Sequence, residues 1–487
     1  MEAAERGELS RAPQSNFGKQ EEEVYEADDD GHKIPLLPSF FHGNREACTS
    51  MSKHSFDVEE NLHKSSKEKN PRQRLASLDV FRGLTIAVMI LVDDGGGAWP
   101  SINHSPWHGV TLADYVMPFF LFIVGMSLVL AFKNTRNRLD AFQKAGLRAL
   151  KLFTLGVFLQ GGYVHGRDNL NFGVDMRHLR IMGILQRISI GYLLVACCEI
   201  LSKVTQVSRK KSSSLEVDTV RSMVMYPWQW ACVLALTSVY LLILYGLRVP
   251  DWHFMPVVSK ELTSAMESTV TRIKCGVRGD LGPACNAVGF LDRTLMGINH
   301  LYINPVYRRT KECSTNSPDY GPLPVDAPAW CSAPFDPEGL VSSLMASISC
   351  FIGAHYGHAL LHFKNHERLL YEWIASGILL KLLGLLIEWL GMPANKPLYT
   401  ISYVCVTGGV AGLVFSAIYV LVDVWNYRKP FLLLEWMGMN ALLIFVLAAI
   451  EVFPALVQGF YWSSPQYNLV SLVEQKKLSK CLNLLKQ

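Results

Sequence analysis

The residues of this chain best suited to chemistry lie between Asp93 and Trp107. Asp93 and Asp94 run directly into glycine residues, and His104 follows between Trp99 and Trp107. A neutral imidazole can act as a nucleophile or as a general base, and a carboxylate beside it can orient the ring or accept a proton. His104 is therefore the candidate catalytic residue, with Asp93 as its candidate partner.

Long apolar segments must position this stretch. An apolar segment of roughly 17–25 residues can cross a bilayer as a helix. We predict such spans at residues 77–95, 111–133, 146–164, 181–202, 227–247, 338–362, 370–390, 399–424 and 431–456. The sequence thus predicts an all-α integral membrane protein, a polytopic helical bundle of about nine to ten transmembrane helices. His104 falls in the short loop between the first two spans.

The composition agrees with a membrane protein that carries polar tails. Half of the 487 residues are hydrophobic, 18% are charged, and the net charge is +4. This charge is too small to predict a nucleic-acid partner, whereas a lipid bilayer is expected as the surroundings. We expect residues 1–75 to form a disordered cytosolic tail, because they are too polar to bury a core. Residues 76–460 are expected to form the bundle, and residues 461–487 a polar C-terminal tail.

The orientation follows from positive charges in the short loops, which mark the cytosolic side. Lys and Arg cluster after the second, fourth, sixth and eighth predicted spans, whereas the loop with Arg167, Arg177 and Arg180 disagrees. The majority places the N-terminus in the cytosol and His104 on the lumenal or extracellular side. The long loop 248–337 then shares the side of His104.

Four of the eleven cysteines lie in this long loop, namely Cys275, Cys285, Cys313 and Cys331. An even group of cysteines in one loop predicts disulfides on a lumenal or extracellular side. The loop holds no CxxC pair and no zinc-like Cys/His spacing, so no metal is expected.

Several polar residues fall inside the predicted spans. Asp79, Arg82 and Asp93 share one face of the first span, and Gln186 and Arg187 lie within the fourth. Ionisable groups at membrane depth are costly unless they face a partner or a wet cavity, so they favour a functional interior. The alternative for Asp79 and Arg82 is an ion pair that only anchors the helix at the membrane surface.

Short motifs at the ends of the spans resemble one known family. In order they are Ser77, Asp79, Arg82 and Gly83, then the Gly95 run with His104 and Trp107, Gln186–Arg187, Asp292–Arg293, His300, Asp336 with Glu338 and Gly339, Ser402, Gly438 with Asn440, and Glu451. Together these motifs resemble the heparan-α-glucosaminide N-acetyltransferase family, and the first span is similar to the wider transmembrane acyltransferases.

This resemblance implies a membrane-bound acetyltransferase. The acetyl group would come from acetyl-CoA in the cytosol and pass to an amino sugar, such as a heparan-type glucosamine in a glycan, on the lumenal side. His104 matches the active-site histidine of the family, whereas Asp93 stands where the family has asparagine. An amide can donate a hydrogen bond to an oxyanion and a carboxylate cannot unless protonated, so Asp93 would act as a base or orient His104.

Further residues follow as candidates for the two substrates. Cations at the cytosolic ends of the spans, Lys133, Arg136 and Arg148, would bind the phosphates of acetyl-CoA, with Arg187 and Gln186 deeper in the bundle. The alternative is that the cytosolic cations only set the topology. Residues expected to bind the acceptor are His300, Trp107, Asp336 and Glu338.

The resemblance also implies a lysosomal or vacuolar membrane, with the plasma membrane as the alternative. Against the family pattern, we expect a homologue that lacks the N-terminal lumenal domain and the last helix. Two other functions stay open at this point, a multispanning transporter and a catalytically inactive relative. The sequence is compatible with a homo-oligomer.

Overall fold

The computed structural model describes residues 75–96, 99, 101–133, 137–160, 179–209, 226–254, 271–302 and 304–450, with the short pieces 26–27 and 33–34. The chain divides into two units, Met1–Gln73 and Arg74–Gln487. In the first, strands β1 (Glu26–Ala27) and β2 (Lys33–Ile34) pair antiparallel. The rest of the expected N-terminal tail up to residue 74, and all of the expected C-terminal tail, lie outside the described residues.

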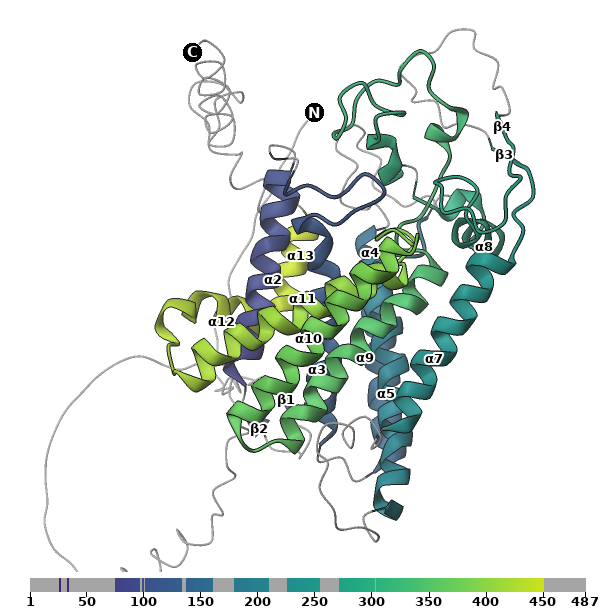
Figure 1. The fold of residues 1–487 in the computed structure, drawn as a ribbon. Helices are drawn as coiled ribbons and strands as arrows, with labels where there is room; N and C mark the ends of the chain where they lie inside the picture. The colour runs from purple at the N-terminus through teal and green to yellow at the C-terminus, as the bar shows by residue number, and fades with distance from the viewer. Residues whose placement is uncertain are drawn as a thin grey trace, which may run out of the picture. The chain divides into compact units, whose positions relative to one another are not determined.

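The second unit is a bundle of long helices (Figure 1). Its helices in chain order are α2 (Ala76–Gly95), α3 (Leu112–Phe132), α4 (Arg138–Gln160), α5 (Ile184–Arg209), α7 (Pro227–Leu241), α8 (Ala287–Met296), α9 (Leu340–His362), α10 (His366–Trp389), α11 (Ile401–Tyr419), α12 (Leu432–Met439) and α13 (Ala441–Ala449). Single π-helical turns, Leu242–Gly246 and Val420–Val424, extend α7 and α11. Two short strands, β3 (Trp252–Phe254) and β4 (Thr271–Ile273), pair antiparallel in the loop between α7 and α8.

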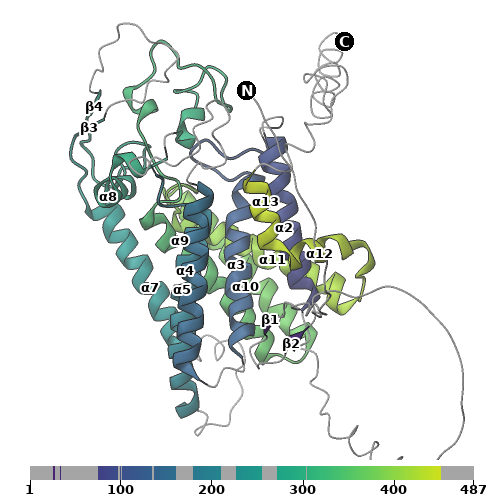
Figure 2. The same ribbon diagram turned by 180° about the vertical axis from the view of Figure 1, so that it is seen from behind.

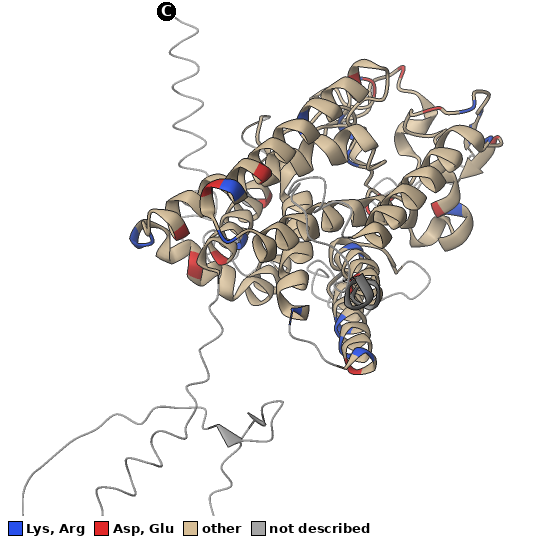
Figure 3. Cartoon of the chain, turned by 60° about the horizontal axis from the view of Figure 1, so that its bottom comes forward, with Lys and Arg blue, Asp and Glu red and all other residues tan. Residues whose placement is uncertain are grey.

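Six described helices are long and apolar enough to cross a membrane, or seven if one bent pair forms a single span. They are Leu112–Phe132, Ile184–Ser202, Pro227–Gly246, Leu340–His362, His366–Trp389 and Ile401–Val424, with the pair Lys429–Met439 and Ala441–Ala449. A mostly helical architecture with several candidate membrane spans is supported, whereas the predicted count of nine to ten spans is not confirmed. Along the helices, Figure 3 shows mostly uncharged residues.

Two predicted spans form helices that carry too much charge to meet this criterion. Helix α2 holds Asp79, Arg82 and Asp93 within 20 residues. Helix α4 begins earlier than the predicted span, and Lys144 and Arg148 lie exposed on its surface. Charged groups at bilayer depth need protein or water around them. In α2 this need is met in part by an ion pair, because Arg82 Nη1 lies 2.8 Å from Asp79 Oδ1.

The last predicted span, 431–456, is not straight over its described part. Helices α12 and α13 meet at an angle of 70°. Asn440 between them has φ −106° and ψ 27°, outside the helical region, and asparagine side chains compete with helical hydrogen bonds. Helix α12 packs against α2, and after the bend α13 runs along α2 (Figure 2).

Helix α9 lies at the centre of the bundle. Within its apolar window 89% of the residues are buried, against 17% for α7 and 22% for α10. It packs against α3 and α5, while α10 packs mainly against α11. Helices α7 and α10 therefore form the outer surface, where their apolar side chains would face lipid.

Glycines allow α9 and α3 to pack with their backbones in contact. A Cβ on Gly353 would lie 1.9 Å from the carbonyl oxygen of Phe122, and a Cβ on Gly125 would lie 1.9 Å from that of Cys350. Gly353 and Gly357 also stand four residues apart on α9, the small-residue spacing typical of close helix pairs in membranes. The contact that holds the core together thus has no room for a methyl group.

A methyl group at this contact should destabilise the bundle. Gly353→Ala is expected to cost at least about 2 kcal/mol, because backbone must shift to relieve the clash. The matched control is Gly146→Ala on α4, where a Cβ would meet nothing within 4 Å. That change should be neutral or stabilise by about 0.5–1 kcal/mol. Thermal unfolding of both variants in detergent tests the prediction, and equal unfolding midpoints would contradict it.

The loop that holds His104 and the long loop before α9 meet at one end of the bundle (Figure 1). The indole of Trp107 donates to the carbonyl of Leu281 at 3.0 Å, and the Asn103 amide donates to Asp319 Oδ1 at 3.1 Å. The two loops therefore share one side of the bundle, as the topology predicted. Which side of the membrane this is stays a proposal.

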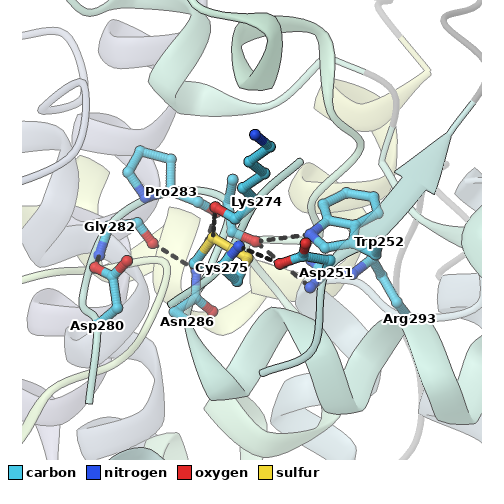
Figure 4. The surroundings of a disulfide bond; sticks show 11 residues. Asp251, Trp252, Lys274, Cys275, Asp280, Gly282, Pro283, Asn286 and Arg293 are labelled. Carbon is cyan, nitrogen blue, oxygen red and sulfur yellow. Dashed lines mark hydrogen bonds between the residues drawn. A yellow bond between two sulfur atoms is a disulfide. The ribbon is translucent and has the colours of Figure 1, made fainter. Parts of the chain in front are cut away.

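The predicted disulfides of the long loop are present in the structure. They join Cys275 to Cys285 and Cys313 to Cys331. Figure 4 shows the first of them, where the Cys275 amide donates to Asp251 Oδ1 at 2.8 Å. These bonds close short loops and so restrict the unfolded chain.

Candidate active site

A buried carboxylate fixes His104 in place. The Asp114 side chain, in the first turn of α3, lies with Oδ1 2.9 Å from His104 Nδ1. Its Oδ2 accepts hydrogen bonds from the amides of Ser105 and Thr111, both at 3.1 Å, and from the Thr111 hydroxyl at 2.9 Å. The carboxylate therefore holds the loop against the start of α3. Its negative charge there also interacts favourably with the positive end of the helix dipole.

The loop is further anchored on the other side of His104. Trp107 is 5% exposed and packs edge-on against Tyr307 and Phe335. The Gly109 amide donates to the carbonyl of Ala394 at 2.8 Å, which ties this loop to the one between α10 and α11. Trp107, expected to stack on a sugar, thus lies in the core of the loop region and away from the His104 cavity.

A cavity of about 220 Å³ opens at His104. Its polar lining consists of Asp93 from α2, His104, Glu338 just before α9, and Lys396 from the loop between α10 and α11. The apolar wall comes from α2, α3, α5 and α13: Met89, Val92, Ala113, Val116, Met117, Phe120, Ile184, Phe445, Ala448 and Ala449. The structure therefore brings together three sequence candidates, His104, Asp93 and Glu338, in one mostly apolar pocket.

Lys396 is the cation of this cavity lining. Its Nζ lies 2.9 Å from His104 Nδ1 and 3.5 Å from Asp114 Oδ1. Burial lowers the pKa of His104, and the ammonium of Lys396 lowers it further, whereas Asp114 acts in the opposite direction. Near neutral pH the imidazole is therefore uncharged and can act as a base or a nucleophile.

Asp336 and Glu338 are held by a single arginine. Arg180 donates from Nε and Nη2 to Asp336 at 2.9 and 2.6 Å, and from Nη2 to Glu338 Oε2 at 2.6 Å. Burial alone would lower the pKa of Arg180, but the two carboxylates outweigh this effect and raise the pKa above the usual value. Asp336 is 1% exposed, so its role in the structure is this ion pair, whereas Glu338 reaches the cavity.

His300 lies beside this network and outside the cavity lining. Its Nδ1 is 2.8 Å from the carbonyl of Leu179, to which it can donate. The neighbouring Asp292 accepts from the Leu340 amide at 2.9 Å and so caps α9 from outside the helix. Burial, with the charge of Asp336, raises the pKa of Asp292 to about 7.

Arg187 is fully buried between α5 and α9. It donates to the carbonyl of Pro337 at 2.7 Å and to the hydroxyls of Ser342 and Ser343 at 2.6 and 3.3 Å. Its guanidinium also lies 5.2 Å from the ring centre of Tyr399. Gln186, equally buried, donates to the carbonyl of Ile181 at 3.0 Å. Arg187 thus binds groups at the start of α9, and Gln186 binds the segment just before α5.

Of the cations expected to bind acetyl-CoA, Lys133 lies at the other end of the bundle, whereas Arg148 lies midway along α4, beside Tyr192 of α5. Lys133 follows the last residue of α3 and is exposed, and Arg148 lies 5.4 Å from the ring centre of Tyr192. Helix α3 has 21 residues, so this end is roughly 30 Å from the His104 end. Arg136 lies outside the described residues.

Sequence reasoning missed Asp114 and Lys396. Asp114 is an aspartate at the start of a membrane helix, ten residues after His104, and such an ionisable group favours a functional role. Lys396 is an isolated lysine in a short loop on the predicted lumenal side, where positive charges are rare. No group of three or more potential metal ligands occurs among the described residues.

Comparison with known proteins identifies the relatives of this chain. The family model described as heparan-alpha-glucosaminide N-acetyltransferase, catalytic, matches residues 74–208, which include His104, Asp114 and Arg187. The heparan-alpha-glucosaminide N-acetyltransferase of Mus musculus is 29% identical over 396 residues, 77% of this chain and 53% of the mouse protein. The chain is homologous to these acetyltransferases.

A second relative agrees with the first. The heparan-alpha-glucosaminide N-acetyltransferase of Homo sapiens is 28% identical over 393 residues, 77% of this chain and 52% of the human protein. The chain thus spans about half the length of the curated relatives it matches. The resemblance inferred from the sequence motifs is confirmed, and it supports a transferase in a membrane.

Proposed function

We propose that this protein transfers the acetyl group of acetyl-CoA to the amino group of an amino sugar, with a heparan-type glucosamine as the model acceptor. The observation that carries the proposal is the contact of His104 Nδ1 with buried Asp114 at the mouth of a cavity. When Nδ1 donates to Asp114, the lone pair of the neutral ring is on Nε2. Such a ring can remove a proton or attack a carbonyl.

Two reaction sequences fit this geometry. In direct transfer, the amine attacks the thioester carbonyl, Nε2 takes the amine proton, the C–S bond breaks and the CoA thiolate leaves. In the two-step route, Nε2 attacks the carbonyl and the C–S bond breaks as the thiolate leaves. The amine then attacks the acetyl-imidazole, the C–Nε2 bond breaks, and the freed Nε2 takes the amine proton. Asp114 stabilises the positively charged ring in both routes.

The size of the cavity limits what it can hold. Pockets for ligands of drug size measure roughly 300–1,000 Å³, whereas this one measures about 220 Å³. The cavity can hold the acetyl-thioester end of acetyl-CoA, which would pack against the apolar wall. The acceptor amine would then lie near Asp93 or Glu338. The nucleotide phosphates would lie outside it, and a donor reaching along the bundle would meet Arg148 midway and Lys133 at the far end.

We place the mouth of the cavity on the lumenal side of a lysosomal or vacuolar membrane, with the N-terminus in the cytosol. The disulfides on the same side as His104 support this orientation, because they persist in oxidising compartments. Lys133 after α3 and Lys144 in the second turn of α4, toward the opposite end, agree with a cytosolic face. Protease accessibility of tagged termini in sealed vesicles tests the orientation.

Purified protein in liposomes, given labelled acetyl-CoA and a panel of sugars, tests the activity. Glucosamine or galactosamine should gain one acetyl group, whereas N-acetylglucosamine, which has no free amine, should gain none. Acetyl bound to His104 in the absence of acceptor, detected by peptide mass spectrometry, would select the two-step route. Solute uptake without acetyl transfer would indicate a transporter instead, and neither activity would indicate a silent relative.

A further inference from the structure

The contact between Lys396 and His104 has an unusual feature. Lys396 Nζ and Asp114 Oδ1 both lie 2.9 Å from the same ring nitrogen, Nδ1 of His104. A ring nitrogen makes one hydrogen bond, as a donor or as an acceptor. If Nδ1 carries the proton, it donates to Asp114 and faces an ammonium; if it does not, it accepts from Lys396 and faces a carboxylate. The two partners therefore compete for one atom.

The loop that presents Lys396 is rigidly built. Asn395 Oδ1 accepts from the Leu398 amide at 2.8 Å, and the Thr400 hydroxyl accepts from the Asn395 amide at 3.0 Å. Tyr399 is fully buried with φ 53°, a left-handed conformation that costs energy in a residue with a bulky side chain. Strain of this kind persists only where the surrounding packing fixes it, often at functional sites.

The charges around His104 come from four elements. Asp114 belongs to α3, Asp93 to α2, Glu338 to the segment before α9, and Lys396 to the loop between α10 and α11. Glu338 is already bound by Arg180. The Lys396 side chain is 16% exposed and lines the cavity, so its ammonium can contact a ligand there.

We propose that Lys396 binds an oxyanion of the acceptor, a carboxylate, sulfate or phosphate, and that this contact draws its ammonium away from Nδ1 of His104, so that Nδ1 donates to Asp114 alone. Lys396 is then a positioning residue that couples the binding of an anionic substrate to the activation of His104. The inference rests on the proposed function for its substrate, but the competition at Nδ1 can be measured without turnover.

Kinetics with a neutral and an anionic acceptor test the coupling. Glucosamine 6-sulfate is compared with glucosamine, because the phosphates of acetyl-CoA would lie outside the cavity that Lys396 lines. A charge-assisted hydrogen bond should give wild type a preference of roughly tenfold in kcat/KM for glucosamine 6-sulfate. Lys396→Met should abolish this preference, and Lys396→Arg should retain it.

The protonation of His104 gives a second readout. Diethyl pyrocarbonate modifies the neutral imidazole, and peptide mass spectrometry measures the rate at His104 against pH. Removing the ammonium should raise the pKa of His104 by about one unit, a tenfold change in proton affinity. Glucosamine 6-sulfate added to wild type should move the pKa in the same direction, whereas glucosamine should not. Should Lys396→Met fold poorly, Lys396→Gln serves as the neutral variant.

The outcomes separate this inference from the proposed function. Wild-type acetyl transfer without a preference for the sulfated acceptor would overturn the inference and leave the function intact. An unchanged His104 titration in both neutral variants would overturn it as well. Conversely, absent acetyl transfer with a shifted titration would reject the proposed function while the Lys396–His104 competition stands.

Discussion

Replacing His104 with alanine should abolish acetyl transfer. Both reaction sequences require Nε2, either to take the amine proton or to form the acetyl-imidazole, and water in its place is a poor substitute. We expect kcat/KM to fall by at least about a thousandfold, which corresponds to roughly 4 kcal/mol of lost transition-state stabilisation. The assay is the transfer of labelled acetyl from acetyl-CoA to an amino sugar in liposomes.

The matched control is His108→Ala in the same loop. The His108 ring is exposed, lies 6.2 Å centre to centre from Trp107, and is not part of the cavity lining. Its removal should change kcat/KM by less than about threefold. Equal activity of His104→Ala and wild type, with both proteins folded, would remove the basis of the enzyme proposal.

The parts of the fold that the sequence predicted are those set by local composition. A long apolar run such as Leu112–Phe132, in which Asp114 is the single charged residue, can satisfy its backbone in a membrane only as a helix, so its ends follow from the sequence. The break at Asn440 could not be predicted in this way. The break accompanies a close contact between distant parts of the chain, α12 and α2, where a Cβ on Gly438 would lie 1.8 Å from the carbonyl of Asp79.

The site shows the same division. His104 was recognisable because an imidazole beside carboxylates and glycines stands out in an apolar sequence, and the structure places it with Asp93 and Glu338. Lys396 lies 292 residues further along the chain, and no local pattern pairs it with His104. Trp107 shows the reverse, since an aromatic residue next to a candidate site predicts stacking on a ligand equally well as packing in a core.

Asp114→Asn should lower kcat/KM by about a hundredfold to ten-thousandfold without unfolding the protein. The amide keeps the shape of the carboxylate, but its NH2 group must face either His104 Nδ1 or the donors from Ser105 and Thr111. In the first case Nδ1 becomes an acceptor, the ring carries its proton on Nε2, and the base is lost. The effect should appear mainly in kcat, because Asp114 does not line the cavity.

The pH dependence distinguishes this variant from Lys396→Met. Asp114 raises the pKa of His104 and Lys396 lowers it. Without the carboxylate, the acid limb of kcat/KM should therefore move to lower pH, and without the ammonium to higher pH. Asp140→Asn, in the first turn of exposed α4, removes the same charge far from His104 and should leave the profile unchanged. Shifts of equal sign in Asp114→Asn and Lys396→Met would mean that the electrostatics of His104 are not set by the competition at Nδ1.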